Sequence, residues 1–329
     1  MREVVLGIDT SCYTTSVACA DVNGELVCSL RKLLSVESGQ CGLRQSEAVF
    51  VHIRQLPQLM EEMGRILRQE EGKIVGVCVS SRPRDVEDSY MPVFTAGYSL
   101  ASSLSSLLGV PLFQTDHQHG HIAAGFIGNR EPEDSYGVIH MSGGTTELLV
   151  SRGERLILVG GSLDLHAGQL LDRFGVGLGF PFPAGAKVEE LALSCPEEPE
   201  GLIPMSLEKD GLHCHLSGAE NKAAALLASG LGRERVAGEL FDFLARTFSR
   251  MLETLCRERN ISQALIVGGV SSSTLLRRRI RERLKKRRVP LQVIFGDPRY
   301  SSDNAAGVAV IGAKQVRRER EEGENGADS

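Results

Sequence analysis

Short apolar segments alternate with longer amphipathic segments along most of this chain. The short segments are bounded by glycine or polar residues and predict buried strands at Val4–Ile8, Ile74–Val79, Val110–Phe113, Ala264–Val267 and Val293–Phe295. The longer segments carry apolar residues at helical spacing and predict helices at Ser46–Glu71, Thr95–Leu108 and Val236–Arg257. Strands and helices that alternate in this way predict an α/β protein.

A similar order of elements occurs twice. The strand Val4–Ile8 leads into a hydroxyl-rich loop from Asp9 to Ser16, a second strand and a hairpin turn at Asn23-Gly24. A loop from Ser142 to Thr146 follows an apolar segment in the same manner. Two such loops facing each other are how a duplicated α/β protein holds the phosphates of a nucleotide, and Asp9 could also hold a metal-bound water. Taken alone, the first loop fits a plain hairpin equally well.

A third candidate ligand loop follows the strand Ala264–Val267. Gly268-Gly269 stands directly after this strand, and a serine run and a helix come next. An apolar strand followed by a glycine pair and a helix favours backbone contact with a ligand. Asp172 stands exposed at the far end of another predicted helix, before a rigid turn that contains Gly185.

Three histidines lie close together in the stretch from Asp116 to His121. If this stretch is helical, His117 and His121 are at i and i+4, so both imidazoles lie on one face and can share one metal ion. His119 then points roughly the other way. Gly120 costs about 1 kcal/mol in a helix, which indicates a close backbone approach. The alternative is a surface helix with scattered histidines.

Composition limits the classes of function. The chain has 329 residues, of which 42% are hydrophobic and 24% charged, as in an ordinary globular protein with room for two domains. Its net charge of −5 does not indicate a general nucleic-acid binder. No apolar run approaches the roughly 20 residues that cross a bilayer. The 8 cysteines form no CxxC pair, so we expect reduced thiols and a cytoplasmic location.

A local basic segment stands out against this acidic background. Arg277–Arg288 contains nine basic residues and one acidic residue, and it includes Arg277, Arg278 and Arg281. Arg82 and Arg84 form a smaller basic loop. Phosphate contacts need only local charge, so both segments are candidate RNA contacts. A solvated helix face is the alternative for the longer segment.

The motifs also occur in a recognisable order. They are Gly7-Ile8-Asp9-Thr10-Ser11, His117-x-x-Gly120-His121, Ser142-Gly143-Gly144, Ala167-Gly168 with Asp172, Pro183-x-Gly185, Ser217-Gly218, Gly268-Gly269-Val270 and Asp303-Asn304-Ala305-Ala306. In this order they resemble the tRNA threonylcarbamoyladenosine transferase family, also described as glycoproteases or O-sialoglycoprotein endopeptidases of the M22 type. The resemblance spans roughly Val4 to Ala313.

The resemblance implies a fold and a division of the chain. The family has the duplicated two-lobe actin/sugar-kinase-like α/β fold with a central nucleotide cleft. Residues 1–113 would form the N-terminal lobe, which the helix 303–315 completes, and residues 114–302 would form the C-terminal lobe with the metal and nucleotide motifs. Residues 316–329 are charged and of low complexity, and we expect them to be a disordered tail.

The resemblance also implies ligands. One divalent metal, Fe(II) or Zn, would be held by His117, His121 and Asp303. An adenine nucleotide, as threonylcarbamoyl-AMP or ATP, would contact the glycine loops. The expected nucleotide and donor contacts are Asp9, Ser11, Ser142, Gly143, Gly144, Asp172, Gly185, Gly268, Gly269 and Ser273.

The implied reaction is transfer of a threonylcarbamoyl group from its adenylate to N6 of an adenosine next to the tRNA anticodon. Implied partners are tRNA and helper proteins, among them a non-catalytic paralogue and a small ATPase, with no membrane association. No catalytic residue is assigned with certainty. The endopeptidase description has little physical support in the sequence, because there is no HExxH signature and no catalytic glutamate beside the histidines.

The chain departs from the family pattern at several cleft positions. Ser81-Arg82-Pro83-Arg84 replaces a Gly-Pro-Gly loop, Thr145-Thr146 follows the Ser-Gly-Gly motif, Ala219-Glu220 follows Ser217-Gly218, and Ser273 replaces an asparagine. These changes indicate a divergent paralogue. Alternative functions are a nucleotide- and metal-binding partner protein without transferase activity, or a carbamoyl-type transferase with another acceptor. A kinase-like or ATPase activity is a further alternative, but no catalytic aspartate can be placed for it.

Overall fold

The computed structural model describes residues 1–11, 13–34, 43–132, 135–153 and 155–327. The chain divides into two compact units, of which unit 1 comprises Met1–Gly128 and Ser302–Ser329 and unit 2 comprises Asn129–Ser301. Residues 114–128, which the sequence analysis assigns to the second lobe, therefore lie in unit 1, because their helix packs on the C-terminal helix. The whole histidine stretch and Asp303 consequently belong to the same unit.

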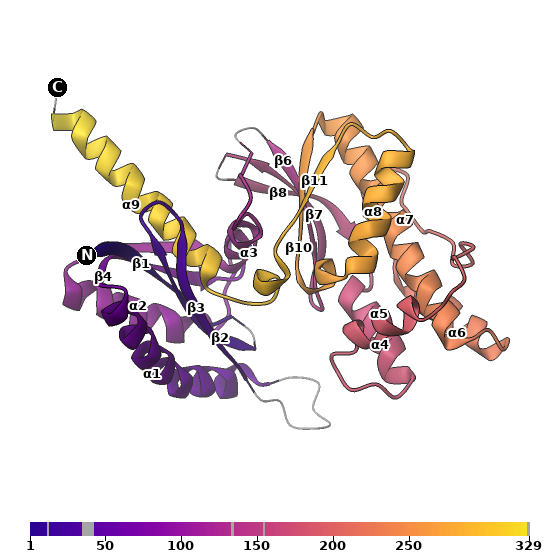
Figure 1. Ribbon diagram of the computed structural model, residues 1–329, viewed down its shortest axis with the longest axis horizontal. Coiled ribbons are helices and arrows are strands. Elements are labelled where there is room, and N and C mark those ends of the chain that lie inside the picture. The colour runs from indigo at the N-terminus through magenta and orange to yellow at the C-terminus, as the bar shows by residue number, and fades with distance from the viewer. Residues whose placement is uncertain (12, 35–42, 133–134, 154, 328–329) are drawn as a thin grey trace. The chain divides into compact units, whose positions relative to one another are not determined.

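In the described part of unit 1, five strands form a sheet of order β3-β2-β1-β4-β5 (Figure 1). Their bounds are β1 Arg2–Asp9, β2 Thr14–Asp21, β3 Leu26–Leu33, β4 Gly72–Arg82 and β5 Leu112–Asp116. β1, β2 and β3 pair antiparallel, whereas β4 and β5 continue the sheet in parallel with β1. The parallel strands β1, β4 and β5 therefore end at the same edge of the sheet, where Asp9 and Asp116 lie.

Helices cover both faces of this sheet. The helices α1 (Gln45–Gln69) and α2 (Phe94–Leu108) pack on one face, and α3 (His117–Gly125) and α9 (Ala306–Ala327) lie on the other. Strand residues alternate between faces, so Leu6 and Ile8 join the core with α1 and α2. Gly7 faces α9, where an added Cβ would lie only 2.5 Å from the backbone nitrogen of Ala309. This glycine allows α9 to lie directly against the sheet.

The C-terminal segment is not the disordered tail expected from its composition. The helix α9 continues to Ala327, and only the last two residues of the predicted tail lie outside the described residues. Arg318 pairs with Glu322 at i,i+4, and Arg320 pairs with Glu3 of β1. Charged residues at helical spacing thus support a helix in a segment that looks like a solvated tail.

In the described part of unit 2, six strands form a sheet of order β11-β10-β6-β7-β8-β9. Their bounds are β6 Tyr136–Met141, β7 Thr146–Arg152, β8 Arg155–Ser162, β9 His213–Cys214, β10 Gln263–Val267 and β11 Gln292–Phe295. The helices are α4 Ala167–Gly177, α5 Gly185–Leu193, α6 Ser217–Ala228, α7 Arg233–Arg259 and α8 Thr274–Lys286, with short 3₁₀ turns η1 Gly269–Ser272 and η2 Pro298–Tyr300.

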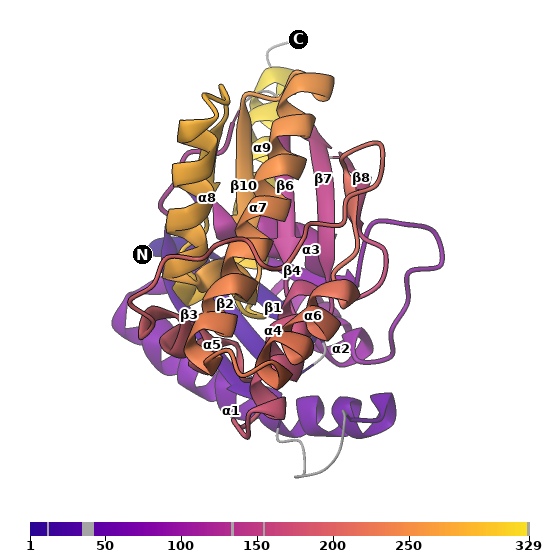
Figure 2. The same ribbon diagram turned by 90° about the vertical axis from the view of Figure 1, so that its right-hand side faces the viewer.

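The core of unit 2 forms between the sheet and its helices. Leu240, Leu244 and Phe248 of α7 are fully buried in the same cluster as Ile139 and Ile266 of the sheet. Figure 2 shows α7 and α8 lying over β10, β6 and β7. β6 and β10 pair in parallel, with Val267 opposite His140, so the loops that follow them leave the sheet side by side.

Two further expectations concern the environment of the chain. The six cysteines within the described ranges are free thiols, as expected. None of the described helices is both long enough and apolar enough to cross a membrane.

Candidate metal centre and ligand loops

The histidine stretch begins a helix immediately after strand β5. The side chain of Asp116 caps this helix, since its Oδ1 accepts a hydrogen bond from the His119 backbone N–H at 2.9 Å. His117 and His121 therefore lie one turn apart on the same face, as the i,i+4 spacing predicts, and their Nε2 atoms are 3.0 Å apart. The Asp116 carboxylate also bonds His119 Nδ1, which directs that ring elsewhere.

Close packing of two helices brings the aspartate to this pair. An added Cβ at Gly307 would lie 1.9 Å from the carbonyl oxygen of Gly120, so only glycine at position 307 allows α9 to approach α3 this closely. Asn304 caps the start of α9, with its Oδ1 accepting from the Ala306 N–H at 2.9 Å. Asp303 consequently stands in the turn just before α9, next to the histidines.

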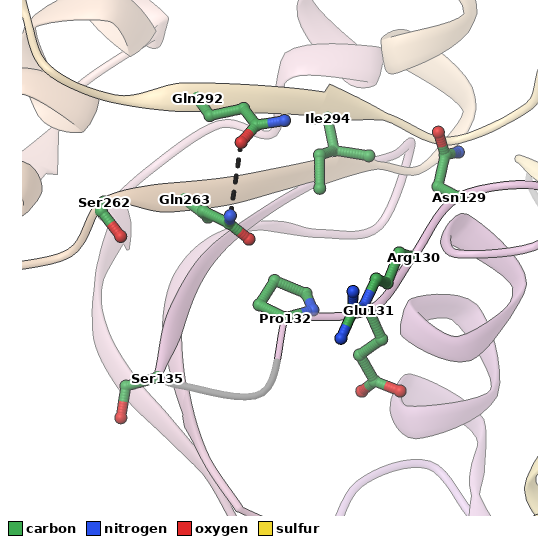
Figure 3. A pocket seen from close by; sticks show the side chains of 9 residues that line it. All are labelled: Asn129, Arg130, Glu131, Pro132, Ser135, Ser262, Gln263, Gln292 and Ile294. Atoms are coloured by element: carbon green, nitrogen blue, oxygen red, sulfur yellow. Dashed lines mark hydrogen bonds between the residues drawn. The ribbon is translucent and has the colours of Figure 1, made fainter.

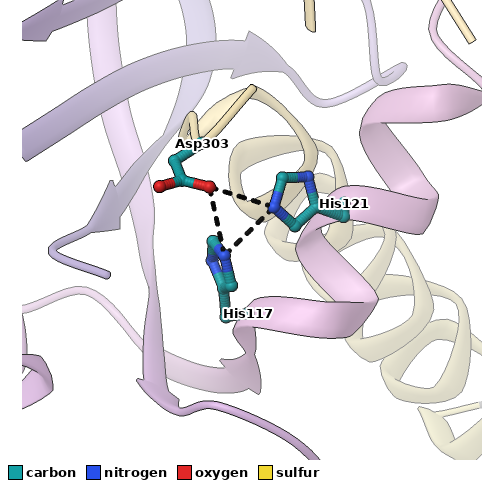
Figure 4. A group of neighbouring side chains, drawn as sticks. All are labelled: His117, His121 and Asp303. Atoms are coloured by element: carbon teal, nitrogen blue, oxygen red, sulfur yellow. Dashed lines mark hydrogen bonds and ion pairs between the residues drawn. The ribbon is translucent and has the colours of Figure 1, made fainter. Parts of the chain in front are cut away.

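The three side chains converge on one point (Figure 4). Asp303 Oδ1 lies 3.5 Å from His117 Nε2 and 3.3 Å from His121 Nε2. The ligand atoms of all three residues lie within 4.8 Å of one another, and His121 is buried. Two imidazole nitrogens and one carboxylate oxygen form a donor set that suits Zn or Fe(II) and leaves coordination positions open.

A second layer of contacts fixes the orientation of His117. Asp9 Oδ2 accepts a hydrogen bond from His117 Nδ1 at 2.9 Å, and the same oxygen accepts one from the Ser80 hydroxyl at 2.6 Å. The other oxygen, Oδ1, accepts from the Ser11 backbone N–H at 2.8 Å. Because Nδ1 donates to Asp9, a metal would bind His117 through Nε2.

These contacts shift the ionisation of the site. Burial opposes protonation of His117, but the carboxylates of Asp9 and Asp303 outweigh it and hold the pKa of the imidazole well above its usual value. Burial alone would raise the pKa of Asp9, yet His117 and the hydrogen bonds from Ser11 and Ser80 keep it below the usual range. The pKa of Asp303 is lowered by the two histidines against the same effect of burial. Both carboxylates are thus ionised, as metal binding requires.

The structure gives Asp9 and Ser11 contacts within the protein. Both side chains are fully buried, and both oxygens of Asp9 are already bonded within the protein. Asp9 therefore supports His117, and contact of Asp9 or Ser11 with the donor stays a prediction. Ser80 is a partner that the sequence analysis missed. It could have been found, because Asp9 and Ser80 directly follow the expected apolar strands Val4–Ile8 and Ile74–Val79, which pair in parallel.

The ligand loops of unit 2 combine two kinds of glycine. Gly268 has a φ of +92° and an added Cβ would lie 2.2 Å from the Met141 carbonyl oxygen, so packing requires glycine there. Gly168 packs on the Ser142–Gly143 loop in a similarly close manner. By contrast, an added Cβ at Gly143 or Gly269 would meet nothing within 4 Å, and the same is true of Gly144 and Gly185. These open backbones can accept a ligand without a change in packing.

Two residues expected to contact the nucleotide have structural contacts of their own. Asp172 Oδ1 accepts from the backbone N–H groups of Ala184, at 2.7 Å, and Gly185, at 3.2 Å, so it holds the start of α5. Ser273 is buried and caps α8, with its hydroxyl accepting from the Leu276 N–H at 3.0 Å. Asp172 thus positions the open backbone of Gly185, and the hydroxyl of Ser273 caps α8. Contact of Ser273 with the donor stays a prediction.

The basic residues of α8 also divide into two groups. Arg277 is half-buried and donates to the carbonyl oxygens of Ser271 and Gly296, each at 2.5 Å. Arg278 is exposed, and so is Arg281, whose guanidinium lies 4.6 Å from the ring centre of Phe295. Arg82 forms an ion pair with Asp85. Arg277 is therefore part of the fold, whereas Arg278 and Arg281 face solvent.

Comparison with known proteins gives a consistent family. A sequence model of TsaD, described as tRNA N6-adenosine threonylcarbamoyltransferase, matches residues 45–310. The chain is 29% identical over 323 residues to the tRNA N6-adenosine threonylcarbamoyltransferase of Carboxydothermus hydrogenoformans, covering 95% of this chain and 92% of the relative. It is 30% identical to a probable bifunctional tRNA threonylcarbamoyladenosine biosynthesis protein of Methanothermobacter thermautotrophicus, covering 93% of this chain and 55% of that protein.

Solved structures agree on the fold. Full-length HypF in its phosphate- and nucleotide-bound form aligns with a TM-score of 0.64 at 14% identity, over 95% of this chain and 46% of that one. Component A of the (R)-2-hydroxyglutaryl-CoA dehydratase of Acidaminococcus fermentans aligns with a TM-score of 0.55 at 14% identity, over 95% of this chain and 99% of that one. With the two α/β sheets, these likenesses confirm the expected two-lobe actin/sugar-kinase-like fold.

Proposed function

The chain belongs to the tRNA N6-adenosine threonylcarbamoyltransferase family, and we propose on this basis that it transfers a threonylcarbamoyl group from threonylcarbamoyl-adenylate to N6 of an adenosine next to the tRNA anticodon. The observation that carries the proposal is the convergence of His117, His121 and Asp303 in a member of a transferase family. A scaffold protein has no need for three converging metal donors and a carboxylate that supports one of them.

The reaction exchanges one bond for another. The N6 nitrogen of adenosine attacks the carbamoyl carbon, and a C–N bond forms while the bond to the AMP phosphate oxygen breaks. AMP leaves with the bonding electron pair, and N6 releases one proton. The donor is already an activated mixed anhydride, so correct positioning of the two substrates can supply much of the rate.

The donor's adenylate is proposed to bind at the turns of unit 2. Ser142–Gly144 and Gly268–Gly269 follow adjacent parallel strands, which is where open α/β sheets bind ligands. Their open backbone can approach phosphate and adenosine closely, and Asp172 keeps the Gly185 backbone in place. These residues bind and orient the donor and need not react themselves.

A divalent metal, Fe(II) or Zn, fits His117, His121 and Asp303, and when bound it would polarise the donor's oxygens and stabilise negative charge on the leaving phosphate. Asp9 holds the Nδ1 proton of His117, which keeps Nε2 directed at the site. Ser80 and Ser11 in turn hold Asp9, so the histidine has little freedom to rotate. We propose Fe(II) and Zn as the two candidate metals.

The proposal includes partners and a place of action. The acceptor is tRNA, and helper proteins such as a non-catalytic paralogue and a small ATPase would assist the reaction in the cytoplasm. The name of the bifunctional Methanothermobacter relative is consistent with a multi-component process.

The direct test supplies threonylcarbamoyl-adenylate, unmodified tRNA and the purified protein, with and without cell extracts that provide helpers. Modified adenosine is then measured by mass spectrometry. We expect product with the intact protein and with His119→Ala, and none with His121→Ala. If no helper yields product and tRNA binds no better than a random polyanion, while metal and adenylate still bind, the protein is a non-catalytic partner instead.

A further inference from the structure

Two cavities lie together at the amino ends of strands β10 and β11, among the described residues of unit 2. One measures about 540 Å³ and is lined by residues that include Arg257, Arg287 and Arg288. The other measures about 410 Å³ and is lined by residues that include Gln263 and Gln292 (Figure 3). Neither contains a residue assigned above to the metal centre or to the ligand loops.

The two cavities share a wall. Ser262 lines both of them, and the segments 260–263 and 289–294 run from one into the other. The Gln292 N–H donates to the Ser262 carbonyl oxygen at 2.9 Å, which joins the two segments at the boundary. A ligand that fills both cavities would therefore cross a fixed ridge of backbone.

The larger cavity carries positive charge. Its lining includes three arginines and one carboxylate, Glu253. Glu253 accepts hydrogen bonds from Nε and Nη2 of Arg287, at 2.7 and 3.0 Å, so it neutralises that arginine. Arg257 and Arg288 are both exposed, and Arg257 forms an exposed ion pair with Glu258 at 3.3 Å. Among the described residues Arg288 has no ion-pair partner, so the cavity keeps a local positive charge in a chain whose overall charge is −5. Local arginines of this kind bind phosphate oxygens.

The smaller cavity offers uncharged hydrogen-bonding groups, beside Arg130 and Glu131, which also line it. The Gln263 Nε2 donates to Gln292 Oε1 at 3.3 Å (Figure 3). This bond leaves the Gln263 carbonyl oxygen as an acceptor and the Gln292 amide nitrogen as a donor beside it. The apolar side chains of Pro132 and Ile294 line the same space. An adjacent donor and acceptor next to apolar surface match the edge and the face of a nucleobase.

We infer that these cavities bind one nucleotide of single-stranded RNA, with its phosphate at Arg257 and Arg288 and its base at Gln263 and Gln292. The inference rests on the proposed function for its RNA substrate. β10 is five residues long, so this site lies about 16 Å along the sheet from the Gly268–Gly269 turn. It would hold the RNA at a distance from the proposed donor loops and affect RNA affinity rather than the transfer step.

The test uses the full-length protein and a labelled 12-nucleotide single-stranded RNA, together with the same backbone lacking bases. Wild-type protein should prefer the RNA with bases by about 5- to 150-fold, the range of one bidentate base contact. Gln263→Ala combined with Gln292→Ala should lose this preference and keep the salt dependence. Arg257→Glu combined with Arg288→Glu should lower the slope of log affinity against log salt by about 0.7 for each lost contact.

A matched control makes the same change of charge elsewhere in unit 2. Lys209 and Lys222 are both exposed and far in sequence from the cavities, so Lys209→Glu combined with Lys222→Glu should leave RNA binding near that of the wild type. If the lysine control weakens RNA binding as much as the arginine variant does, the arginine effect reflects general charge, and the proposed site is overturned. No preference of wild type for bases would overturn the base pocket. If the double arginine variant is less stable than the wild type, the milder variant Arg288→Gln is used to repeat the measurement of the salt slope.

Measurements of transferase activity distinguish a failure of this RNA site from a failure of the proposed function. If the arginine variant forms product with an unchanged KM for tRNA, the proposed RNA site is wrong and the proposed transferase function stands. If the variants change RNA binding as expected but the wild-type protein forms no product, the RNA site is supported and the proposed transferase function is wrong. Competition by AMP at the same concentration as the RNA would indicate a free-nucleotide site and also overturn the inference.

Discussion

His117 donates its Nδ1 proton to Asp9 across 2.9 Å, although the two residues are 108 positions apart in the chain. The contact arises because Asp9 ends β1, and His117 begins the helix after β5, at the same edge of one sheet. Ligand histidines in metalloproteins commonly give their second nitrogen to a carboxylate in this way. The pair therefore links the fold of unit 1 to the proposed metal chemistry.

The first prediction concerns the metal ligands. His117→Ala, His121→Ala and Asp303→Ala should each remove most of the bound metal, because each takes away one of three converging donors. His119→Ala should retain it, since that ring bonds Asp116. Metal content of the purified variants, measured by mass spectrometry, decides the matter. Equal loss in the His119 variant, or none in the Asp303 variant, contradicts this ligand set.

The second prediction concerns the carboxylate behind His117. Asp9→Asn keeps the size of the side chain but weakens its hold on the Nδ1 proton, and metal affinity should fall by about 10- to 100-fold. Ser80→Ala removes one of the two bonds to Asp9 Oδ2 and should have a smaller effect. Competition with a chelator measures both affinities. An Asp9 variant with wild-type affinity would show that His117 needs no orientation from this residue.

The third prediction separates the two kinds of glycine. Gly269→Val and Gly143→Val should abolish adenylate binding in a folded protein, because their side chains would enter open space where the ligand is proposed to lie. Gly268→Ala should instead lower the melting temperature, since its Cβ would meet the Met141 carbonyl at a positive φ. Calorimetry and thermal unfolding distinguish the outcomes. A folded Gly269 variant with unchanged affinity removes this loop from the binding site.

Much of the candidate site could be predicted from local sequence. The spacing of His117 and His121 fixes their common face wherever a helix forms, and glycines after apolar strands indicate backbone exposed to ligands. Asp303 could not be reached in this manner. Its place beside the histidines depends on Gly307, which allows α9 to contact α3, and such long-range packing has no local signal.

The fold, like the site, follows only in part from local sequence. The long helices and the apolar strands follow from periodicity, whereas the boundary between the units depends on packing. The helix α3 stands next to the second unit in sequence but packs on α9 and therefore belongs to the first. The role of Arg277 was missed for a related reason, because a basic run gives no indication of which arginines turn inward to backbone carbonyls.

The fourth prediction concerns stability and pH. Burial would raise the pKa of Asp164, but hydrogen bonds from the Ser217 hydroxyl and the Leu216 and Leu165 N–H groups lower it to about 2. A lowered carboxylate pKa stabilises the fold above the unfolded-state value of about 4, and this stabilisation is lost as the pH falls toward 2. Asp164→Asn should cost about 1–2 kcal/mol at pH 7, allowing for a partly exposed side chain. Urea unfolding should show a smaller difference at pH 3, and a constant difference contradicts the assignment.

The last prediction divides the arginines of α8. Arg277 fills two backbone acceptors, so Arg277→Ala should lower the free energy of unfolding by about 1–3 kcal/mol, the cost of leaving buried polar groups unpaired. Arg278 and Arg281 face solvent, so Arg278→Glu combined with Arg281→Glu should leave stability unchanged. If this face contacts tRNA, the double variant should bind it more weakly and reduce the salt slope by about 0.7–0.9 per lost contact, with adenylate affinity intact. Filter binding over a salt series gives the slope. An unchanged slope would assign these two arginines to a solvated helix face, because a phosphate contact cannot be lost without releasing fewer counterions on binding.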